Sequence, residues 1–216
     1  VIALMDSEGI QRAELIGHSL GGKIASALAL SYPERVNSLA VLDIAPVSYT
    51  PEDASWWQVD SVIEAMAKLP LHLISSREQA DEILSQRISD PILRRFALTN
   101  LLAVHGDNPG SPAWKWRINI QAIKDYLPDI RGFDIGQGPH DVESLGLRYD
   151  GEVFFISGRR SKYISTRHLP EIARLFPKYN MVTIRNAGHW VHSESPEETL
   201  NFVKMFLDRN AAAADR

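Results

Sequence analysis

The chain has 216 residues, of which 44% are hydrophobic and 23% are charged, and none is cysteine. This composition is that of an ordinary globular protein and argues against disorder and fibrous structure. The formal net charge of −4 gives no electrostatic support for nucleic-acid binding, so no nucleic-acid partner is expected.

The absence of cysteine excludes disulfides and thiolate metal sites and fits a reducing compartment. No apolar run approaches the roughly 18 residues of a membrane span, and no signal peptide is visible. We therefore expect an intracellular protein, cytoplasmic in a bacterium or mitochondrial in a eukaryote. The chain begins with valine rather than methionine, so we also expect that upstream sequence was removed or left out. The sequence does not indicate an oligomeric state.

The amino-terminal part predicts a strand, a helix and a second strand. Residues 1–8 have the pattern of an amphipathic helix that stops at Gly9, and residues 13–19 form a short apolar strand. A helical pattern follows and stops near Pro33. Residues 38–46 are a continuous apolar run, which is typical of a parallel strand buried on both faces. This order predicts an α/β fold with a mostly parallel sheet flanked by helices.

The middle of the chain changes to a helical pattern and keeps it. We predict an all-helical cap at residues 51–132, inserted between two parts of the α/β core at 1–50 and 133–216. Two of the cap helices have recognisable N-terminal signals. Ser76 opens a capping box, and Asp90 stands directly before a proline.

Sheet character returns in the last third of the chain. Residues 133–151 have a loop composition, and residues 152–158 are the next strand. A helix that ends near Pro177 and a strand at 181–187 follow. A last amphipathic helix covers about 197–208, and the alanine-rich tail after it is expected to be frayed or disordered.

The stretch LIGHSLGGK places Ser19 between Gly17 and Gly21, where the strand pattern gives way to the helical one. This spacing matches the G-x-S-x-G turn in which a serine is exposed as a nucleophile. Its glycine neighbours leave room where strand and helix approach each other closely. The alternative is an ordinary strand-to-helix turn capped by a serine.

A serine hydroxyl becomes a useful nucleophile only beside a base, and the base needs a group that orients it. Folds with this turn place the acid and then the histidine later in the chain. His189, in NAGHWVH after the last strand, combines a late position with a strand-end loop. A surface histidine without a role is the alternative.

Together, IGHSLGGKIA, VLDIAP and NAGHWVH resemble the α/β-hydrolase superfamily. They resemble more closely its branch of bacterial and mitochondrial serine esterases and acyl-CoA thioesterases, whose further motifs are matched by WRIN (116–119) and GRRSKYI (158–164). The resemblance covers essentially the whole chain. It implies a serine hydrolase that cleaves small acyl esters or thioesters through an acyl-enzyme. Peroxidase or C–C hydrolase chemistry at the same residues is an alternative.

The resemblance also bears on the acid. Most members of the superfamily place it after the strand that corresponds to 152–158, where this chain has Ser161, which cannot carry the charge. Asp43, 24 residues beyond Ser19, is therefore the candidate, and the resemblance implies Ser161 as a supporting hydrogen-bonding member. Asp43 as a plain turn-capping carboxylate is one alternative. Asp150 is another, although it precedes its strand and so lies at the wrong end of a parallel sheet.

Leu20, directly after the serine, is expected to bind the oxyanion through its N–H group. The resemblance implies that the second donor, with several strands, lies upstream of Val1. Three explanations are open: a fragment, a half that is supplied separately, or a catalytically dead protein. A hydrolase-fold protein that acts as a binding module is therefore our second hypothesis.

Further residues have weaker indications. Trp116, like the other tryptophans of the cap, is a candidate contact for the acyl chain, with burial against the core as the alternative. Trp190 is a second candidate for substrate binding. Arg159 and Arg160 either meet a coenzyme A phosphate or form a solvated pair. Lys23 is expected to face solvent.

We predict neither a metal nor a cofactor. His189 and His192 are three residues apart and His105 lies near Asp107, but neither pair reaches three ligands at metal spacing. His18 is expected to pack against neighbouring loops.

Overall fold

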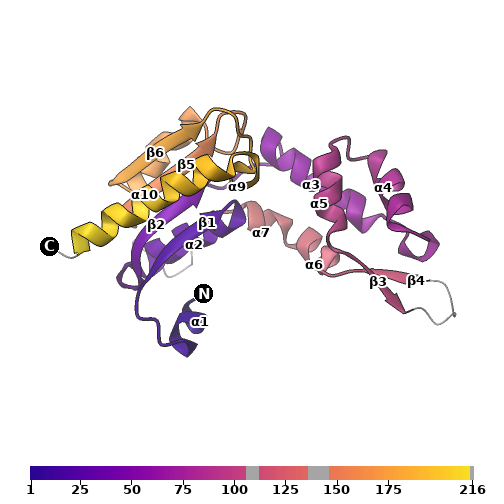
Figure 1. Ribbon diagram of the computed structural model, residues 1–216, viewed down its shortest axis with the longest axis horizontal. Helices are drawn as coiled ribbons and strands as arrows, with labels where there is room; N and C mark the ends of the chain where they lie inside the picture. The colour runs from indigo at the N-terminus through magenta and orange to yellow at the C-terminus, as the bar shows by residue number, and fades with distance from the viewer. Residues whose placement is uncertain (106–111, 136–145, 215–216) are drawn as a thin grey trace. The chain divides into compact units, whose positions relative to one another are not determined.

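The structure, a computed structural model, describes residues 1–105, 112–135 and 146–214. The chain forms two compact units (Figure 1). The first joins Val1–Ser48 to Gly132–Arg216, and the second is the stretch between them, Tyr49–Arg131. The insertion predicted from the sequence was 51–132. Each unit has its own cluster of buried apolar side chains.

The first unit is built on a four-stranded, all-parallel sheet in the order β1-β2-β5-β6. This arrangement confirms the predicted α/β fold. Its strands are β1 (Ala13–His18), β2 (Val36–Leu42), β5 (Glu152–Gly158) and β6 (Tyr179–Ile184). Its helices are α1 (Ile2–Ser7), α2 (Leu20–Ser31), α8 (Leu169–Leu175), α9 (Val191–Glu194) and α10 (Pro196–Ala214), with short 3₁₀ turns η1 (Pro33–Arg35) and η3 (Thr166–His168).

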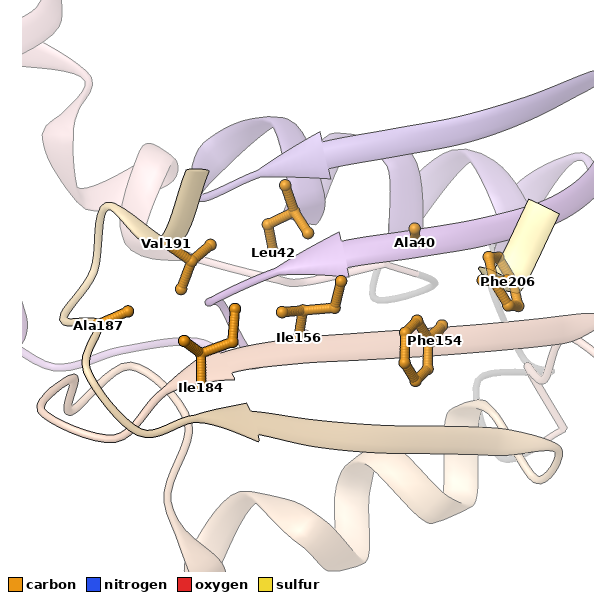
Figure 2. Close-up of a cluster of buried hydrophobic side chains, with 8 residues drawn as sticks. All are labelled: Ala40, Leu42, Phe154, Ile156, Ile184, Ala187, Val191 and Phe206. Carbon is orange, nitrogen blue, oxygen red and sulfur yellow. The ribbon is translucent and has the colours of Figure 1, made fainter. Parts of the chain in front are cut away.

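Helices α2 and α10 cover opposite faces of this sheet. Gly22 of α2 lies so close to β2 that a Cβ there would be 3.0 Å from the Val41 side chain. Ala40 and Leu42, the strand neighbours of Val41, pack in one cluster with Phe206 of α10 (Figure 2). Because side chains alternate along a strand, β2 is buried on both faces, as its apolar run predicts. The cluster on the α10 face comprises Ala40, Leu42, Phe154, Ile156, Ile184, Ala187, Val191 and Phe206.

The carboxyl ends of the strands lie side by side. In the register of the sheet, His18 is next to Leu42, Leu42 is next to Ile156, and Gly158 is next to Ile184. Because all four strands run in one direction, the loops that follow them leave from the same edge. Ligand and catalytic sites of parallel sheets lie at this edge.

The second unit is mostly helical, but the all-helical prediction is wrong. Strands β3 (Leu101–His105) and β4 (Pro112–Trp116) form an antiparallel pair. The helix that was predicted to begin at Asp90 ends at Leu98, ahead of Thr99 and Asn100, two poor helix formers. A short apolar run such as LLAV fits a strand as well as a helix. The helices of this unit are α3 (Ala54–Ala67), α4 (Arg77–Ser85), α5 (Pro91–Leu98), α6 (Ile120–Asp125) and α7 (Leu127–Arg131), with a 3₁₀ turn η2 (Leu71–Leu73).

Both predicted helix starts are capped by a side chain, but the capping box predicted at Ser76 is only half formed, because the Gln79 side chain accepts from the Ser75 amide (2.7 Å) instead of the Ser76 amide. The Ser76 hydroxyl accepts a hydrogen bond from the Gln79 amide (3.1 Å), at the start of α4. The Asp90 carboxylate accepts one from the Ile92 amide (2.8 Å), at the start of α5. Each bond satisfies an amide that has no acceptor within its helix, which contributes about 1 kcal/mol.

Hydrogen bonds hold together the two chain segments that connect the units. The Phe133 amide donates to the Ser48 hydroxyl (2.7 Å), and this hydroxyl donates to the Asp134 carboxylate (3.1 Å). Beside them, the Tyr49 amide donates to the Arg131 carbonyl (3.1 Å). The insertion therefore begins and ends at one place in the fold.

The remaining differences concern the ends of elements. Helix α10 continues through Ala214, so much of the tail expected to be frayed is helical. Residues 136–145, within the predicted loop 133–151, lie outside the described residues.

Within the ranges that the structure describes, no helix combines the length and apolar character needed to cross a membrane.

Candidate active site

Ser19 lies in a tight turn between β1 and α2. Its backbone has φ 53° and ψ −123°, a conformation that glycine adopts easily and that costs other residues about 1–3 kcal/mol. The Ser19 amide donates to the Leu42 carbonyl at the end of β2 (3.0 Å). The turn is therefore fixed to the neighbouring strand while it holds a strained residue.

The glycines that the turn around Ser19 requires are not the two that the G-x-S-x-G motif names. A Cβ at Gly17 would lie 2.3 Å from the Gly21 carbonyl oxygen, and one at Gly22 would lie 2.7 Å from the Ile44 side chain. A Cβ at Gly21 would meet no described atom within 4 Å. Gly17 and Gly22, rather than Gly17 and Gly21, therefore allow α2 to approach the sheet.

His189 lies in the loop between β6 and α9 and joins two residues that are far away in the sequence. Its Nε2 is 2.9 Å from the Ser19 hydroxyl oxygen, and its Nδ1 is 2.8 Å from an Asp43 carboxylate oxygen. The histidine side chain is 19% exposed and that of Asp43 is fully buried. The three candidate residues thus form one hydrogen-bonded chain.

Asp43 follows the last residue of β2 and has φ 52°, a left-handed conformation in which aspartate is enriched several-fold. Its second carboxylate oxygen accepts a hydrogen bond from the Gly158 amide at the end of β5 (2.9 Å). Asp150, the rival acid, forms an exposed ion pair with Arg148 (3.0 Å). Of the two aspartates, the structure brings Asp43 to His189.

Ser161 lies in the loop after β5, but its hydroxyl accepts from the Tyr163 amide (3.2 Å). In the part of the chain that the structure describes, the Asp43 carboxylate bonds to Gly158 and His189. The supporting position that the resemblance implies for Ser161 is thus occupied by a backbone amide.

The buried ring of Tyr163 stacks on the imidazole of His189, with centroids 4.0 Å apart and an interplanar angle of 27°. Burial raises the pKa of the Tyr163 hydroxyl, and the charge of Asp43 adds to this effect. The phenol therefore stays neutral at physiological pH. Tyr163 was part of the quoted motif GRRSKYI, but sequence reasoning gave it no role.

Leu20 begins α2, so its amide has no acceptor within the helix. The amides of Gly22 and Lys23 donate to the Ser19 carbonyl at 2.8 and 3.2 Å. The helix N-terminus next to Ser19 carries a partial positive charge, which favours a negatively charged oxygen there. The position of Leu20 thus suits the oxyanion role expected from the sequence.

His18 packs against the loop that carries His189, as expected. Its Nε2 donates to the His189 carbonyl oxygen (2.8 Å), and its ring centroid lies 4.5 Å from that of His192. Burial lowers the pKa of His18 to about 4, although the hydrogen bond to the carbonyl acts in the opposite direction. His18 is therefore neutral at pH 7.

The two candidate substrate contacts lie in different units. Trp190 follows His189 directly, with ring centroids 5.8 Å apart. Trp116 ends β4 in the second unit and packs against a cluster that contains Ala97 and Ile120. A part in substrate binding stays a prediction for both.

Lys23 corrects a sequence expectation, because it is buried rather than solvent-facing. Its ammonium group lies 5.9 Å from the centroid of the Phe133 ring. Burial lowers its pKa to about 8, while Asp134 acts in the opposite direction. Lysine in an amphipathic pattern does not reveal such burial, because its apolar stem tolerates both environments.

Among the described side chains, no group of three histidine, aspartate or glutamate residues is arranged to hold a metal ion. The side chain of His105 and all of Asp107, which the sequence analysis considered, lie outside the described residues.

Comparison with known proteins identifies similar proteins over nearly the whole chain. It is 35% identical over 206 residues to the sn-1-specific diacylglycerol lipase ABHD11 of Mus musculus, an alignment that covers 94% of this chain and 62% of the relative. It is 29% identical over 210 residues to esterase YbfF of Escherichia coli (strain K12), covering 96% and 72%. The chain thus spans about three-fifths of the length of the ABHD11 relatives.

A solved structure described as a marine microorganism esterase superposes with a TM-score of 0.83 at 26% identity, covering 95% of this chain and 74% of the other. Residues 2–202 match the model of the alpha/beta hydrolase family. This match contains the strand-end loops that hold Ser19, Asp43 and His189. The chain therefore belongs to the alpha/beta hydrolase family.

Proposed function

We propose that this protein is a serine hydrolase that cleaves carboxylic esters or acyl thioesters through an acyl-enzyme. One observation carries the proposal: the His189 imidazole lies within hydrogen-bond distance of both the Ser19 hydroxyl (2.9 Å) and the buried Asp43 carboxylate (2.8 Å). The names of the similar proteins, a lipase and esterases, support the same class of reaction.

In the first half-reaction, Ser19 Oγ attacks the acyl carbonyl carbon while His189 Nε2 takes its proton. The bond from the carbonyl carbon to the leaving oxygen or sulfur then breaks. The leaving alcohol or thiol receives the proton from Nε2. Asp43 keeps the other imidazole proton on Nδ1 and stabilises the positive charge that the ring carries between these steps.

The negative charge that develops on the carbonyl oxygen needs hydrogen-bond donors. The Leu20 amide, at the N-terminus of α2 beside the nucleophile, is the donor that we assign from this chain. In enzymes of this kind one such donor is worth about 10²–10³ in rate. The neighbouring ring of Trp190 is our candidate for an apolar contact with the substrate, and Trp116 remains a candidate for the acyl chain.

In the second half-reaction, the same residues act on water. His189 Nε2 takes a proton from the water molecule, whose oxygen attacks the acyl carbon. The bond to Ser19 Oγ breaks, and Nε2 returns the proton to this oxygen. The products are a carboxylic acid and the free enzyme.

A fluorophosphonate probe tests the proposal, because it reacts covalently with an activated serine. We expect one label per chain in the wild type, no label in Ser19→Ala, and full labelling in Ser31→Ala, which changes an exposed serine at the other end of α2. Hydrolysis of p-nitrophenyl esters and acyl thioesters of increasing chain length then identifies the substrate class. A folded wild type that neither hydrolyses nor becomes labelled would overturn the proposal in favour of a binding protein.

A further inference from the structure

Glu194, at the end of α9, binds the backbone on both sides of His189. Its Oε2 accepts a hydrogen bond from the Gly188 amide (3.0 Å) and its Oε1 accepts one from the Trp190 amide (3.2 Å). The two oxygens of a single carboxylate therefore hold the residues that immediately precede and follow the histidine. These bonds fix the backbone at two points around one Cα and so fix the position from which the histidine side chain projects.

Arg160, in the loop after β5, fixes the carboxylate in turn. Its guanidinium donates to Glu194 Oε2 (2.6 Å) and to the Asn186 carbonyl (3.1 Å). Its own amide donates to the Ala187 carbonyl (3.0 Å). Although its side chain is 64% exposed, Arg160 is thus not merely one half of a solvated pair.

Two glycines, Gly188 and Gly158, provide the space that this arrangement needs. A Cβ at Gly188 would lie 3.1 Å from Glu194 Oε1, so a side chain there would crowd the carboxylate. A Cβ at Gly158 would lie 1.9 Å from the Gly188 carbonyl oxygen, because the end of β5 runs directly against the His189 loop. The contact at Gly158 requires the absence of a side chain, whereas a side chain at Gly188 would force the Glu194 carboxylate to shift by a few tenths of an ångström.

The charge state of Glu194 suits the role of an acceptor. Burial acts to raise the pKa of its carboxyl group, but the hydrogen bonds from Gly188, Arg160 and Trp190 outweigh burial and hold the pKa below its usual value. The group is therefore a carboxylate at neutral pH. Hydrogen bonds to a charged acceptor are about twice as strong as those between neutral groups.

We propose that Glu194 is a positioning residue for His189, acting through the Gly188 and Trp190 amides, with Arg160 holding its carboxylate in place. The inference rests on the proposed hydrolase function. His189 must keep Nε2 at Ser19 and Nδ1 at Asp43 at the same time, and these partners follow different strands. A displacement of about 1 Å in such a geometry can lower a rate by roughly 10²-fold. Glu194 fixes the loop against that displacement.

The test compares Glu194→Ala and Glu194→Gln with Glu197→Ala, a matched control that removes an exposed acid three residues away, in the first turn of α10. For a p-nitrophenyl ester we expect Glu194→Ala to lower kcat about 10- to 100-fold and to leave KM within about threefold. Glutamine keeps one acceptor oxygen, so Glu194→Gln should lie between Glu194→Ala and the wild type. The control should match the wild type.

Two readouts do not depend on turnover. In Glu194→Ala, hydrogen exchange at the Gly188 and Trp190 amides should become faster, because these amides lose their acceptor. The NMR signal of the His189 Nδ1 proton, whose nitrogen lies 2.8 Å from Asp43, should broaden or shift. In Glu197→Ala both readouts should stay as in the wild type.

The outcomes separate the two proposals. Wild-type kcat in Glu194→Ala, unchanged exchange at the two amides, or a loss of activity that only follows the fraction of unfolded protein would each overturn the role of Glu194. None of these results affects the hydrolase proposal if Ser19→Ala is inactive. If the wild type hydrolyses nothing, the hydrolase proposal fails, and the exchange and NMR measurements still decide whether Glu194 holds His189.

Discussion

Replacing Asp43 by asparagine changes the charge and hydrogen-bonding pattern at the candidate site but almost nothing else. Asparagine has the same shape as aspartate and tolerates the left-handed backbone of this position. In the wild type, the Asp43 carboxylate accepts one hydrogen bond from the Gly158 amide (2.9 Å) and one from His189 Nδ1 (2.8 Å). An amide has one acceptor oxygen and one donor nitrogen, so it can satisfy only one of these partners as they stand.

The two orientations of the amide differ in energy. If its oxygen faces Gly158, its NH₂ group faces His189 Nδ1, which must then lose its proton. The proton moves to Nε2, where it prevents the ring from accepting the proton of Ser19. If the oxygen faces His189, two N–H donors oppose each other at a fully buried position, which costs about 1–3 kcal/mol. The inactive tautomer is therefore favoured by roughly 5- to 150-fold.

The lost charge lowers the rate further. A charge-assisted hydrogen bond to the imidazolium is worth about 1.5–3 kcal/mol, which corresponds to roughly 10- to 150-fold in rate. Together the two effects predict that Asp43→Asn lowers kcat/KM about 10²- to 10⁴-fold, similar to the loss of about 10⁴ known for a comparable triad. The melting temperature should change little.

The assay is steady-state hydrolysis of an activated ester, with circular dichroism and melting temperature as checks on folding. Asp150→Asn is the matched control, because Asp150 lies in an exposed ion pair with Arg148 and should keep full activity. A folded Asp43→Asn variant with more than a third of wild-type kcat/KM would refute the reasoning. So would a large loss in Asp150→Asn alone.

Two further predictions concern stability. Gly17→Ala places a Cβ 2.3 Å from a backbone oxygen and should lower the free energy of unfolding by about 3 kcal/mol or more, whereas Gly21→Ala should be neutral or raise it by up to about 1 kcal/mol. Equal urea midpoints for both variants would contradict this contrast. The pKa of His18 is lowered from 6.5 to about 4 by burial, so the unfolded chain binds more protons between these pH values and stability falls as the pH drops through this window. Because the ring is partly exposed, we expect the free energy of unfolding to fall by about 1–3 kcal/mol across this window. Urea unfolding at a series of pH values measures this loss, and the pH dependence should be shallower in His18→Gln.

Much of the core was predictable because its signals are local. The continuous apolar run of β2 predicts a strand that is buried on both faces, and the run at β5 predicts a further strand. The helical pattern between β1 and β2 predicts a crossover helix, which makes these two strands parallel. The hairpin of β3 and β4 was missed because its pairing is not local. A few apolar residues after α5 continue a helical pattern equally well until their partner strand is known.

The candidate site was predictable at the residues whose chemistry is distinctive. Ser19, Asp43 and His189 have a motif or a position at a strand end. The support around them was not predictable, because Gly158 contributes only a backbone amide and Glu194 acts on amides from an exposed helix turn. The role implied for Ser161 depended on whether its hydroxyl or the Gly158 amide at the end of β5 reaches Asp43, and spacing alone does not decide this.

The bonds that join Ser48 to Phe133 and Asp134 have a consequence for how such a protein can diversify. An insertion between two residues that are already held side by side has a small entropic cost of loop closure, and this cost rises only slowly with the length of the insertion. The inserted segment can therefore be substituted, lengthened or exchanged without disturbing the strand ends that carry Ser19 and Asp43. The inserted segment and the strand ends can in this way evolve under separate selection within a single gene product.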